Sequence, residues 1–378
     1  MTELQPDGSA PRTRRTAELV GLAVGALAAG AAAGAAAERF AVRRALGRPD
    51  PMRDEPFGTL RGAPYPVTAS DGVVLHVEID EPQTGDGAAV PVTVVLVHGY
   101  ALNLDSWHFQ RRDLRDVARL VLLDQRSHGR SGRSPVAHAT LEQTGRDLGT
   151  VIDEVAPEGP LVLIGHSMGG MTIMNLAEQR PVLFRERVLA VGLLATSAAG
   201  LNDLPSGLRG IPGRVVRRVL PAVVSALGRR AGVVERGRQL GNDLGHVLTR
   251  RYSFASDVPH SYVEWTSDMI AATPIDVVAD FFPIFDKHDR LAALAGMRDV
   301  ETLVMVGRQD KVTPLGLSEA IARELPQARL VVLEDCGHML VLEHHEAVTA
   351  ELRRLVERAA AAAPAGRAGS RRRPARRR

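Results

Sequence analysis

The sequence predicts an α/β fold: a mostly parallel, doubly wound sheet that carries a helical insertion. Three observations lead to this prediction. Short apolar runs alternate with helical patterns, and these runs are apolar almost throughout. The alternation stops between about residues 198 and 294. Near-continuous runs of Val, Leu and Ile are typical of parallel strands covered on both faces. Strands that alternate with helices favour parallel pairing, because each helix returns the chain to the start of the next strand.

The predicted elements follow one another in a regular order. The strands are an outer run at 73–79 and then 92–97, 120–124, 161–165, 188–194, 302–307 and 329–333. The helices that connect them are 141–155, 171–178, 317–325 and 347–358.

The chain is predicted to have one folded domain, residues 67–358. A cap is expected over about 198–294, where the pattern is helical and lacks clear strands. Such an insertion would lie over the carboxyl ends of the strands, where open α/β sheets bind ligands. The remaining segments are interpreted as a disordered N-terminus (1–17), an apolar Ala/Gly helix (18–48), a Pro-rich linker (49–66) and a disordered Arg-rich tail (359–378).

Basic residues are concentrated at the two ends of the chain. The tail from Arg367 to Arg378 holds seven arginines and no acid, and residues 1–48 carry seven arginines against four acids. The rest of the chain is mildly acidic, so we expect no nucleic-acid partner. The single cysteine, Cys336, excludes an intramolecular disulfide, and no Cys/His grouping has structural-zinc spacing. We expect no metal and no cofactor.

Residues 19–37 form an uncharged run of Ala, Gly, Val and Leu. Its length approaches the ~20 residues that a helix needs to span a bilayer, which predicts an N-terminal transmembrane helix and a membrane-associated protein. Two alternatives stay open. A cleaved signal peptide would make the protein secreted, and a weakly apolar helix that never enters a bilayer would leave it cytoplasmic. Arginines flank both sides of the run, so the positive-inside rule gives no orientation.

The strongest motif is Gly165-His166-Ser167-Met168-Gly169, which follows a predicted buried strand and precedes a helical pattern. A serine at such a sharp strand-to-helix turn is held in strained backbone geometry with its hydroxyl exposed. The helix N-terminus beside it favours a developing anion. We therefore predict Ser167 as a nucleophile. The alternative is a glycine-rich turn that carries a solvated serine.

A serine hydroxyl needs a base to take its proton, and the acid and base are expected at later strand ends. Asp310 follows the run 302–307 and His338 follows the run 329–333. We predict His338 as the base and Asp310 as the acid that accepts the imidazole Nδ1–H. Asp286 and Asp289 are the alternatives for the acid, whereas His344, His345 and Asp335 are interpreted as surface residues.

A tetrahedral intermediate also requires an oxyanion hole. One backbone N–H is expected from Met168, the residue after the nucleophile. The other is expected from Tyr100, in the loop that follows the run 92–97. His98 in the same loop is interpreted as structural.

Residues 92–345 resemble the α/β-hydrolase superfamily, in its esterase, lipase and haloperoxidase-like branch. The resemblance implies the α/β-hydrolase fold with a helical cap. In the similar epoxide hydrolases and dehalogenases the nucleophile is an aspartate, so Ser167 argues against those chemistries. The loop 124–131 is structural in the family, and Ser127 stands where the family commonly has glycine. The matching motifs are His98-Gly99-Tyr100, the loop 124–131, Gly165 to Gly170, Gly307-Arg308-Gln309-Asp310 and Gly337-His338.

The sequence thus predicts a serine hydrolase that cleaves a carboxylic ester through an acyl-enzyme intermediate. Its substrate is expected to be a small molecule with an apolar acyl group. Phe281, Phe282 and Phe285 suit an apolar acyl pocket, and core packing explains them equally well. Thioesterase, lactonase, C–C hydrolase, acyltransferase and cofactor-free perhydrolase chemistry stay open, as does a non-catalytic ligand-binding protein on the same scaffold.

Overall fold

The computed structural model describes residues 49–82, 92–201, 242–285 and 288–363. The chain divides into two units, Met1–Asp50 and Pro51–Arg378, and every element below belongs to the second. The segments 1–17 and 18–48, and most of the Arg-rich tail, lie outside the described residues.

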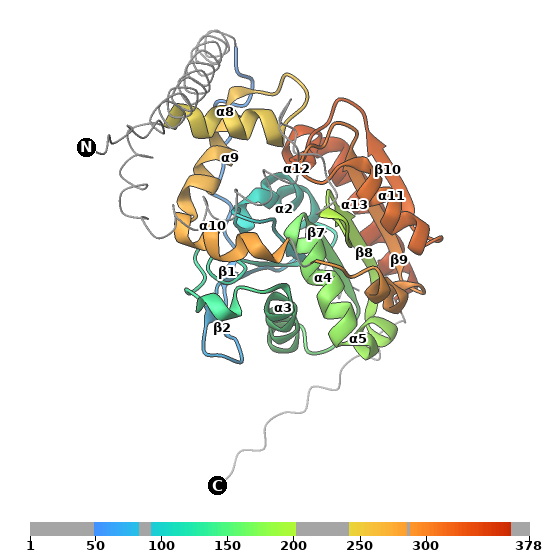
Figure 1. The fold of residues 1–378 in the computed structure, drawn as a ribbon. Helices are drawn as coiled ribbons and strands as arrows, with labels where there is room; N and C mark the ends of the chain where they lie inside the picture. Colours follow the sequence, from blue (N-terminus) through green and yellow to red (C-terminus); the bar gives the residue numbers. More distant parts are fainter. Residues whose placement is uncertain (1–48, 83–91, 202–241, 286–287, 364–378) are drawn as a thin grey trace, which may run out of the picture. The chain divides into compact units, whose positions relative to one another are not determined.

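Eight of the described strands form one sheet in the order β1-β4-β6-β5-β7-β8-β9-β10 (Figure 1). All pairings from β6 to β10 are parallel, and β1 and β4 add an antiparallel edge. This mostly parallel sheet confirms the predicted fold class, and the six predicted parallel strands agree with β5 to β10 to within one residue at each end. The bounds are β1 Ala63–Pro64, β4 Val77–Asp80, β5 Thr93–Val97, β6 Arg119–Leu123, β7 Leu161–His166, β8 Val188–Leu194, β9 Glu301–Gly307 and β10 Arg329–Leu333.

The outer strand expected at 73–79 is divided in two. β3 (Val74–Leu75) pairs with β2 (Val67–Thr68) in a separate small sheet, and β4 joins the main sheet. The break falls at His76, whose backbone N–H donates to Ser131 Oγ (2.8 Å). A side chain 55 residues away therefore interrupts a run that the local pattern predicts as continuous.

The order of the strands reverses at β5, which pairs with β6 on one side and with β7 on the other. In open α/β sheets this reversal opens a crevice at the carboxyl ends of the strands, and ligands bind there. The loops that follow β5 and β7 flank this crevice.

Helices cover both faces of the sheet (Figure 1). Alternate residues of each strand point to opposite faces, so Val95 and Val97 enter one core cluster while Val94 and Leu96 enter the other. The first face carries α3 (Leu141–Val155), α4 (Met168–Gln179), α5 (Pro181–Glu186) and α11 (Leu315–Glu324). The second carries α2 (His108–Leu114), α12 (Leu340–Glu343) and α13 (His345–Ala362).

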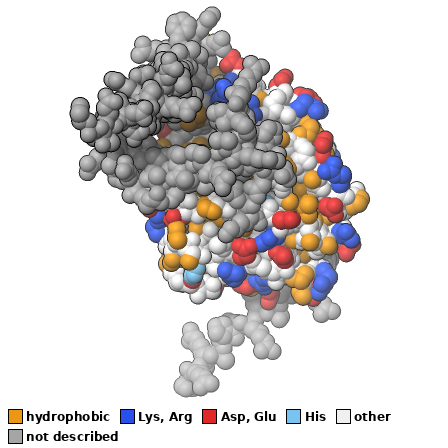
Figure 2. All heavy atoms as spheres, viewed as in Figure 1, with side chains coloured by type: hydrophobic (Ala, Val, Ile, Leu, Met, Phe, Trp, Pro, Cys, Tyr) orange, Lys and Arg blue, Asp and Glu red, His pale blue; other side chains and the backbone are white. Residues whose placement is uncertain are grey.

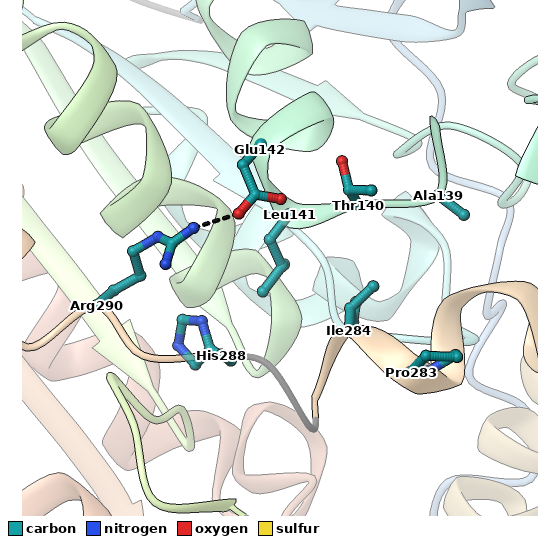
Figure 3. Close-up of a pocket in the computed structure, with 8 residues that line it drawn as sticks. All are labelled: Ala139, Thr140, Leu141, Glu142, Pro283, Ile284, His288 and Arg290. Atoms are coloured by element: carbon teal, nitrogen blue, oxygen red, sulfur yellow. Dashed lines mark hydrogen bonds and ion pairs between the residues drawn. The ribbon is translucent and has the colours of Figure 1, made fainter. Parts of the chain in front are cut away.

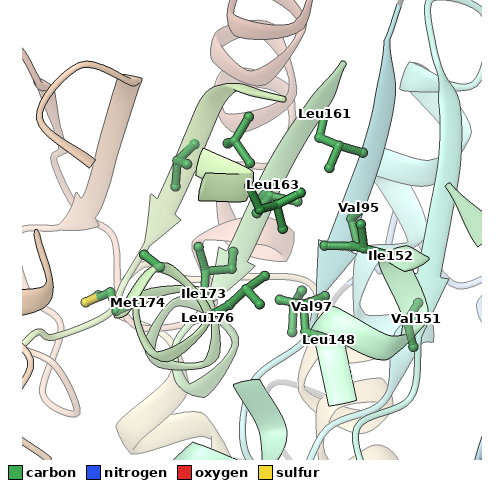
Figure 4. Packing of buried hydrophobic residues seen from close by; sticks show 14 of the residues in the cluster. Val95, Val97, Leu148, Val151, Ile152, Leu161, Leu163, Ile173, Met174 and Leu176 are labelled. Atoms are coloured by element: carbon green, nitrogen blue, oxygen red, sulfur yellow. The ribbon is translucent and has the colours of Figure 1, made fainter. Parts of the chain in front are cut away.

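Helix α3 shows how the local sequence builds one layer. Thr140 caps its N-terminus by accepting a hydrogen bond from Gln143 N (3.1 Å). Leu148, Val151, Ile152 and Val155 recur at helical spacing and are buried against the sheet. Figure 4 shows Leu148, Val151 and Ile152 packing against residues of β5 and β7 and against α4.

Within the predicted cap, 198–294, the described residues contain no strand, and 202–241 and 286–287 lie outside the description. They form α8 (Asn242–Ser253), α9 (His260–Ala272), α10 (Ile275–Phe281) and the short turns η4 (Phe282–Ile284) and η5 (Ala292–Met297). Phe254, Tyr262 and Met269 pack into the second core cluster. This part of the insertion is therefore packed on the domain core.

The prediction of a transmembrane helix has to be corrected. No helix in the described part of the chain is long and apolar enough to cross a membrane, and the run 19–37 that carried the prediction lies outside that part. The described surface in Figure 2 carries acidic and basic side chains interspersed with apolar ones.

Candidate active site

Ser167 occupies the sharp turn between β7 and α4. Its backbone has φ 53° and ψ −118°, a left-handed conformation that costs a non-glycine residue on the order of 1–3 kcal/mol. Ser167 N–H donates to Leu194 O (2.9 Å), and Ser167 O accepts from Thr196 Oγ1 (2.7 Å) as well as from N–H groups of the first turn of α4. The surrounding structure thus imposes the strain, as it does at many functional sites.

Two glycines of the motif permit the close packing at this turn. A Cβ at Gly165 would lie 2.5 Å from Gly169 C and Gly170 N, and a Cβ at Gly169 would lie 2.0 Å from Val97 O. Both clashes are with backbone atoms, which cannot swing away. The Gly-x-Ser-x-Gly spacing is therefore a steric requirement for bringing α4 against β5 and β7.

Asp310 and His338 are brought together from the ends of two neighbouring strands, β9 and β10. His338 Nδ1 lies 2.9 Å from Asp310 Oδ2, and both residues are buried. Asp310 Oδ1 also accepts from the N–H groups of Val312 (2.8 Å) and Thr313 (2.9 Å), and Oδ2 accepts from Thr313 Oγ1 (2.8 Å). The carboxylate is held in one orientation by these donors.

The charge of Asp310 fixes the proton on His338. Burial of the carboxyl group opposes its ionisation, but the neighbouring His338 and the Thr313 donors outweigh burial, so the pKa of Asp310 lies below its ordinary value. An ionised Asp310 only accepts hydrogen bonds, so Nδ1 of His338 must donate. In the neutral imidazole, Nε2 is then left as the basic atom.

The turn that carries Ser167 contacts the loop that carries His338 through His166. His166 Nε2 donates to His338 O (3.0 Å), and the two imidazole rings lie 4.9 Å apart. Among the described residues, no hydrogen bond joins Ser167 Oγ to His338 Nε2. Nucleophile–base hydrogen bonds are often long in resting sites and tighten when substrate binds.

The loop after β5 comes close to the nucleophile. A Cβ at Gly99 would lie 3.2 Å from Ser167 Cβ and 2.9 Å from His166 Nδ1. Tyr100, the next residue, donates its hydroxyl to Val278 O of α10 and packs beside Met168 in a third apolar cluster. Tyr100 and Met168, predicted as the two backbone donors, thus flank the turn at Ser167.

His98 has both ring nitrogens engaged within the protein. Nε2 accepts from Gln125 N (2.9 Å), and Nδ1 donates to Gly99 O (2.7 Å). Burial, together with the nearby His128, lowers the pKa of His98 to about 3, so the ring stays neutral. His98 therefore holds the loop after β5 against the loop after β6 through these hydrogen bonds.

The loop 124–131 is built around the buried Asp124 carboxylate. Leu104 N (2.7 Å) and Arg130 N (2.8 Å) donate to it, and a Cβ at Gly129 would lie within 2.5 Å of its atoms. Burial raises the pKa of Asp124 to about 6 despite these donors. Hydrogen bonds join this loop, which follows β6, to the loop after β5, and none of the described ones joins it to Asp310 or His338.

Among the described residues, none of the alternative acids and histidines is hydrogen-bonded to the side chain of His338. Asp335 is exposed and lies near Gln309 (3.5 Å), and His344 is hydrogen-bonded to Asp335 O (3.2 Å). His345 stacks on Phe109, with ring centroids 3.8 Å apart. Asp289 lies at the cap exit beside Arg290, and Asp286 lies outside the described residues.

Sequence reasoning missed Glu343, which joins the cap to the His338 loop. Its Oε1 accepts from Ala255 N (2.9 Å), Ser256 N (2.6 Å) and Ser256 Oγ (2.7 Å), and its Oε2 accepts from Gly337 N (2.6 Å). A glutamate beside a helical pattern gives no sequence signal for such a role. Thr313 was also missed, although its position three residues after Asp310 is the spacing of a local turn.

The fold agrees with comparisons to known proteins. The family model described as alpha/beta hydrolase fold matches residues 92–345, and the chain belongs to this family. The chain is 31% identical over 284 residues to the dihydrolipoyllysine-residue acetyltransferase component of the acetoin cleaving system of Cupriavidus necator, covering 74% of this chain and 66% of that protein. The chain thus spans slightly less than two thirds of that relative.

Other relatives include esterases. The chain is 25% identical to the pimeloyl-[acyl-carrier protein] methyl ester esterase of Aromatoleum aromaticum, covering 67% of this chain and 93% of that protein. Among solved structures, a thermophilic esterase from Thermogutta terrifontis matches with a TM-score of 0.56 and 24% identity, over 78% of this chain and 98% of that one. The enol-lactonase from Burkholderia xenovorans matches with a TM-score of 0.60 and 21% identity, over 78% and 100%. These structural matches show the fold.

Proposed function

We propose that the chain is a serine hydrolase that cleaves a carboxylic ester, with Ser167 as nucleophile, His338 as base and Asp310 as orienting acid. The observation that carries this proposal is the strained turn at Ser167, which is joined through His166 to the loop of His338, whose Nδ1 lies 2.9 Å from a buried carboxylate. The esterase relatives support the same reaction class.

The chemistry follows from the proton positions. His338 Nε2 takes the proton of Ser167 Oγ as the oxygen attacks the ester carbonyl, and Asp310 stabilises the imidazolium that forms. The backbone N–H groups of Met168 and Tyr100 stabilise the oxyanion, and losing one such donor costs about 10²–10³ in rate. His338 then protonates the leaving alcohol and activates a water, which releases the acid and restores Ser167.

An apolar acyl group suits the surroundings of the nucleophile. Met168 and Met171 of α4 form a buried cluster with Val277, Phe281 and Ile284 of the cap. Tyr100 and Phe285 pack at its edge, with ring centroids 5.1 Å apart. The cap therefore places apolar side chains next to the residue that follows Ser167.

The acetyltransferase relative supports a second candidate, transfer of the acyl group to an acceptor other than water. The acyl-serine ester would form as above, and an alcohol or thiol acceptor would replace water in the second step. Product analysis with added alcohol or thiol acceptors separates the two, because transfer yields a new ester or thioester and hydrolysis yields the free acid.

The proposal is tested with the purified full chain and p-nitrophenyl esters of graded acyl length. We expect ester cleavage and labelling by a fluorophosphonate probe, both lost in Ser167→Ala. Ser197→Ala is the matched control, since its buried hydroxyl donates to Ala199 O (2.5 Å) and has no part in the proposed triad. Full activity in Ser167→Ala would refute the assignment.

A further inference from the structure

The loop after β5 forms a tight turn next to the nucleophile. Leu102 N–H donates to Gly99 O (3.3 Å), which closes a turn of four residues. The third residue, Ala101, has φ 56°, a left-handed backbone at the position where type II turns usually have glycine. Strained backbone of this kind persists only where the surrounding structure holds it. The second residue is Tyr100, whose backbone N–H is proposed as an oxyanion donor.

The backbone donors at this turn have no protein acceptor. Among the described residues, no group accepts a hydrogen bond from the N–H of Tyr100 or from that of Met168. A Cβ at Gly99 would lie 3.2 Å from Ser167 Cβ, so the turn lies directly against the nucleophile. Donors that are kept unpaired beside a nucleophile are what an oxyanion hole requires.

Two hydrogen bonds from the cap hold the middle of the turn. Thr273, which follows the last residue of α9, donates its hydroxyl to Ala101 O (3.1 Å). Tyr100 donates its own hydroxyl to Val278 O of α10. Thr273 is 2% exposed, so water does not compete for its bond. Each of the two central residues of the turn is therefore bonded to the cap segment 273–278.

The Tyr100 side chain fits its place in the cap. Val278 O also accepts from Phe282 N–H at the end of α10, and a carbonyl oxygen has two lone pairs for these two donors. The ring packs at the edge of an apolar cluster, with its centroid 5.1 Å from that of Phe285. The hydroxyl and the ring thus fix the Tyr100 side chain at two points.

The cap segment that holds the turn is itself packed on the domain. Phe281 of α10 and Ile284 of η4 are buried in one cluster with Leu141 of α3 and Met168 of α4. Figure 3 shows Leu141 and Ile284 among the residues that line a pocket of about 120 Å³, where this part of the cap meets α3. Because Met168 follows the nucleophile, the Tyr100 turn and the Ser167 turn share one support.

We propose that the cap takes part in the chemical step, with Thr273 and the Tyr100 hydroxyl as positioning groups that hold the Tyr100 N–H in place as an oxyanion donor. The inference rests on the proposed ester hydrolysis. Neither hydroxyl touches the substrate; both fix the turn whose N–H does. Loss of a whole donor costs about 10²–10³ in rate, and a displaced donor costs less, so we expect about a tenfold loss in kcat for each hydroxyl removed.

Tyr100→Phe removes one hydroxyl and retains the ring and the backbone N–H. We expect kcat for p-nitrophenyl butyrate to fall about tenfold and KM to stay within about twofold, because the donor acts on the transition state. Tyr252→Phe is the matched control, since it removes a hydroxyl from a side chain of α8 that is 38% exposed. Its kcat is expected to stay within about twofold of the parent.

A transition-state analogue gives a second readout that a merely structural role does not move. Ser167 Oγ adds to the carbonyl carbon of trifluoromethyl propyl ketone, its proton passes to His338, and the carbonyl oxygen becomes an oxyanion. The affinity for this ketone is expected to fall by the same factor as kcat in Tyr100→Phe. End-point titration of Ser167 with a fluorophosphonate probe corrects both readouts for the fraction of folded protein.

Thr273 provides an independent pair of variants if Tyr100→Phe folds poorly. Thr273→Val removes the hydroxyl at nearly constant volume and is expected to reproduce the loss in kcat and in ketone affinity. Thr273→Ser restores a hydroxyl and is expected to recover most of the rate.

The outcomes separate this inference from the proposed function. Values of kcat and ketone affinity within about twofold of the parent in Tyr100→Phe and Thr273→Val would overturn the positioning role, while ester cleavage that depends on Ser167 leaves the proposed function standing. A higher KM with an unchanged kcat would assign these contacts to substrate binding and would also overturn it. Ester cleavage that persists in Ser167→Ala would refute the proposed function and the inference together.

Discussion

Replacing Asp310 by Asn tests whether the buried carboxylate sets the proton on His338. Asn keeps an oxygen for the N–H groups of Val312 (2.8 Å) and Thr313 (2.9 Å), so the local turn is preserved. Its amide nitrogen then occupies the place of Oδ2, 2.9 Å from His338 Nδ1, and donates instead of accepting. The proton on His338 is forced to Nε2, which removes the base that Ser167 needs.

The expected loss in kcat is on the order of 10⁴, which corresponds to about 5.5 kcal/mol of transition-state stabilisation. It combines the wrong tautomer with the loss of a negative charge beside the imidazolium. The assay is kcat and kcat/KM for p-nitrophenyl butyrate at pH 7, with the rate of fluorophosphonate labelling as a second readout and a thermal melt to show that the variant is folded.

Asp335→Asn is the matched control, since it makes the same chemical change at an exposed carboxylate close to His338 in sequence. Asn tolerates the left-handed backbone found there, φ 48°. We expect its activity to stay within about twofold of the parent, as surface substitutions usually have small effects. A folded Asp310→Asn protein within tenfold of the parent rate would refute the assigned role.

Gly169→Ala places a Cβ 2.0 Å from a backbone carbonyl of β5 and should lower the free energy of unfolding by more than about 2 kcal/mol. Gly316→Ala is the control, because nothing lies within 4 Å of the added Cβ, and it should leave the thermal midpoint unchanged or slightly raised. Asp147→Ala removes one of the two carboxylates that bind the fully buried Arg126, at 2.6 Å, and leaves Asp71 (2.9 Å) as its carboxylate partner. It should cost about 1–3 kcal/mol in urea unfolding, because buried guanidinium N–H groups lose their acceptor, and an unchanged free energy of unfolding would contradict this. The pKa of Asp71 lies far below 3.8, chiefly through its hydrogen bond to Arg126, so its contribution to stability is complete above about pH 4 and is lost as the pH falls further. Asp71→Asn should therefore flatten the acid side of the stability-versus-pH curve, and an unchanged slope would count against this coupling.

The parts of the fold that were predictable have a local physical signature. The runs that became β5 and β7 are apolar throughout because both faces are covered, and that pattern is visible residue by residue. The turn at Ser167 was predictable for a similar reason, since the glycines at 165 and 169 are demanded by clashes with nearby backbone. Local steric clashes and burial thus restrict which residue types can occupy these positions, so the sequence shows them.

The parts that could not be predicted depend on partners far away in the chain. Glu343 bonds to residues 87 and 88 positions earlier, and His288 bonds to Ser197, 91 positions earlier. Neither residue type nor spacing predicts these contacts, because a glutamate that bonds to a distant segment cannot be told from a solvated glutamate in the sequence. The break of the outer strand at His76 has the same origin in Ser131.

The contacts around His338 bear on how the cap influences the chemistry. A Cβ at Gly337 would lie 2.7 Å from Ser253 O, and Met339 N–H donates to that same carbonyl (2.8 Å). Glu343 adds hydrogen bonds from Ser256 N (2.6 Å) and Gly337 N (2.6 Å) on either side. The chain leaving α8 is thereby fastened to both neighbours of His338, while Asp310 holds the ring itself. The backbone on both sides of His338 is therefore tied to this cap segment by hydrogen bonds.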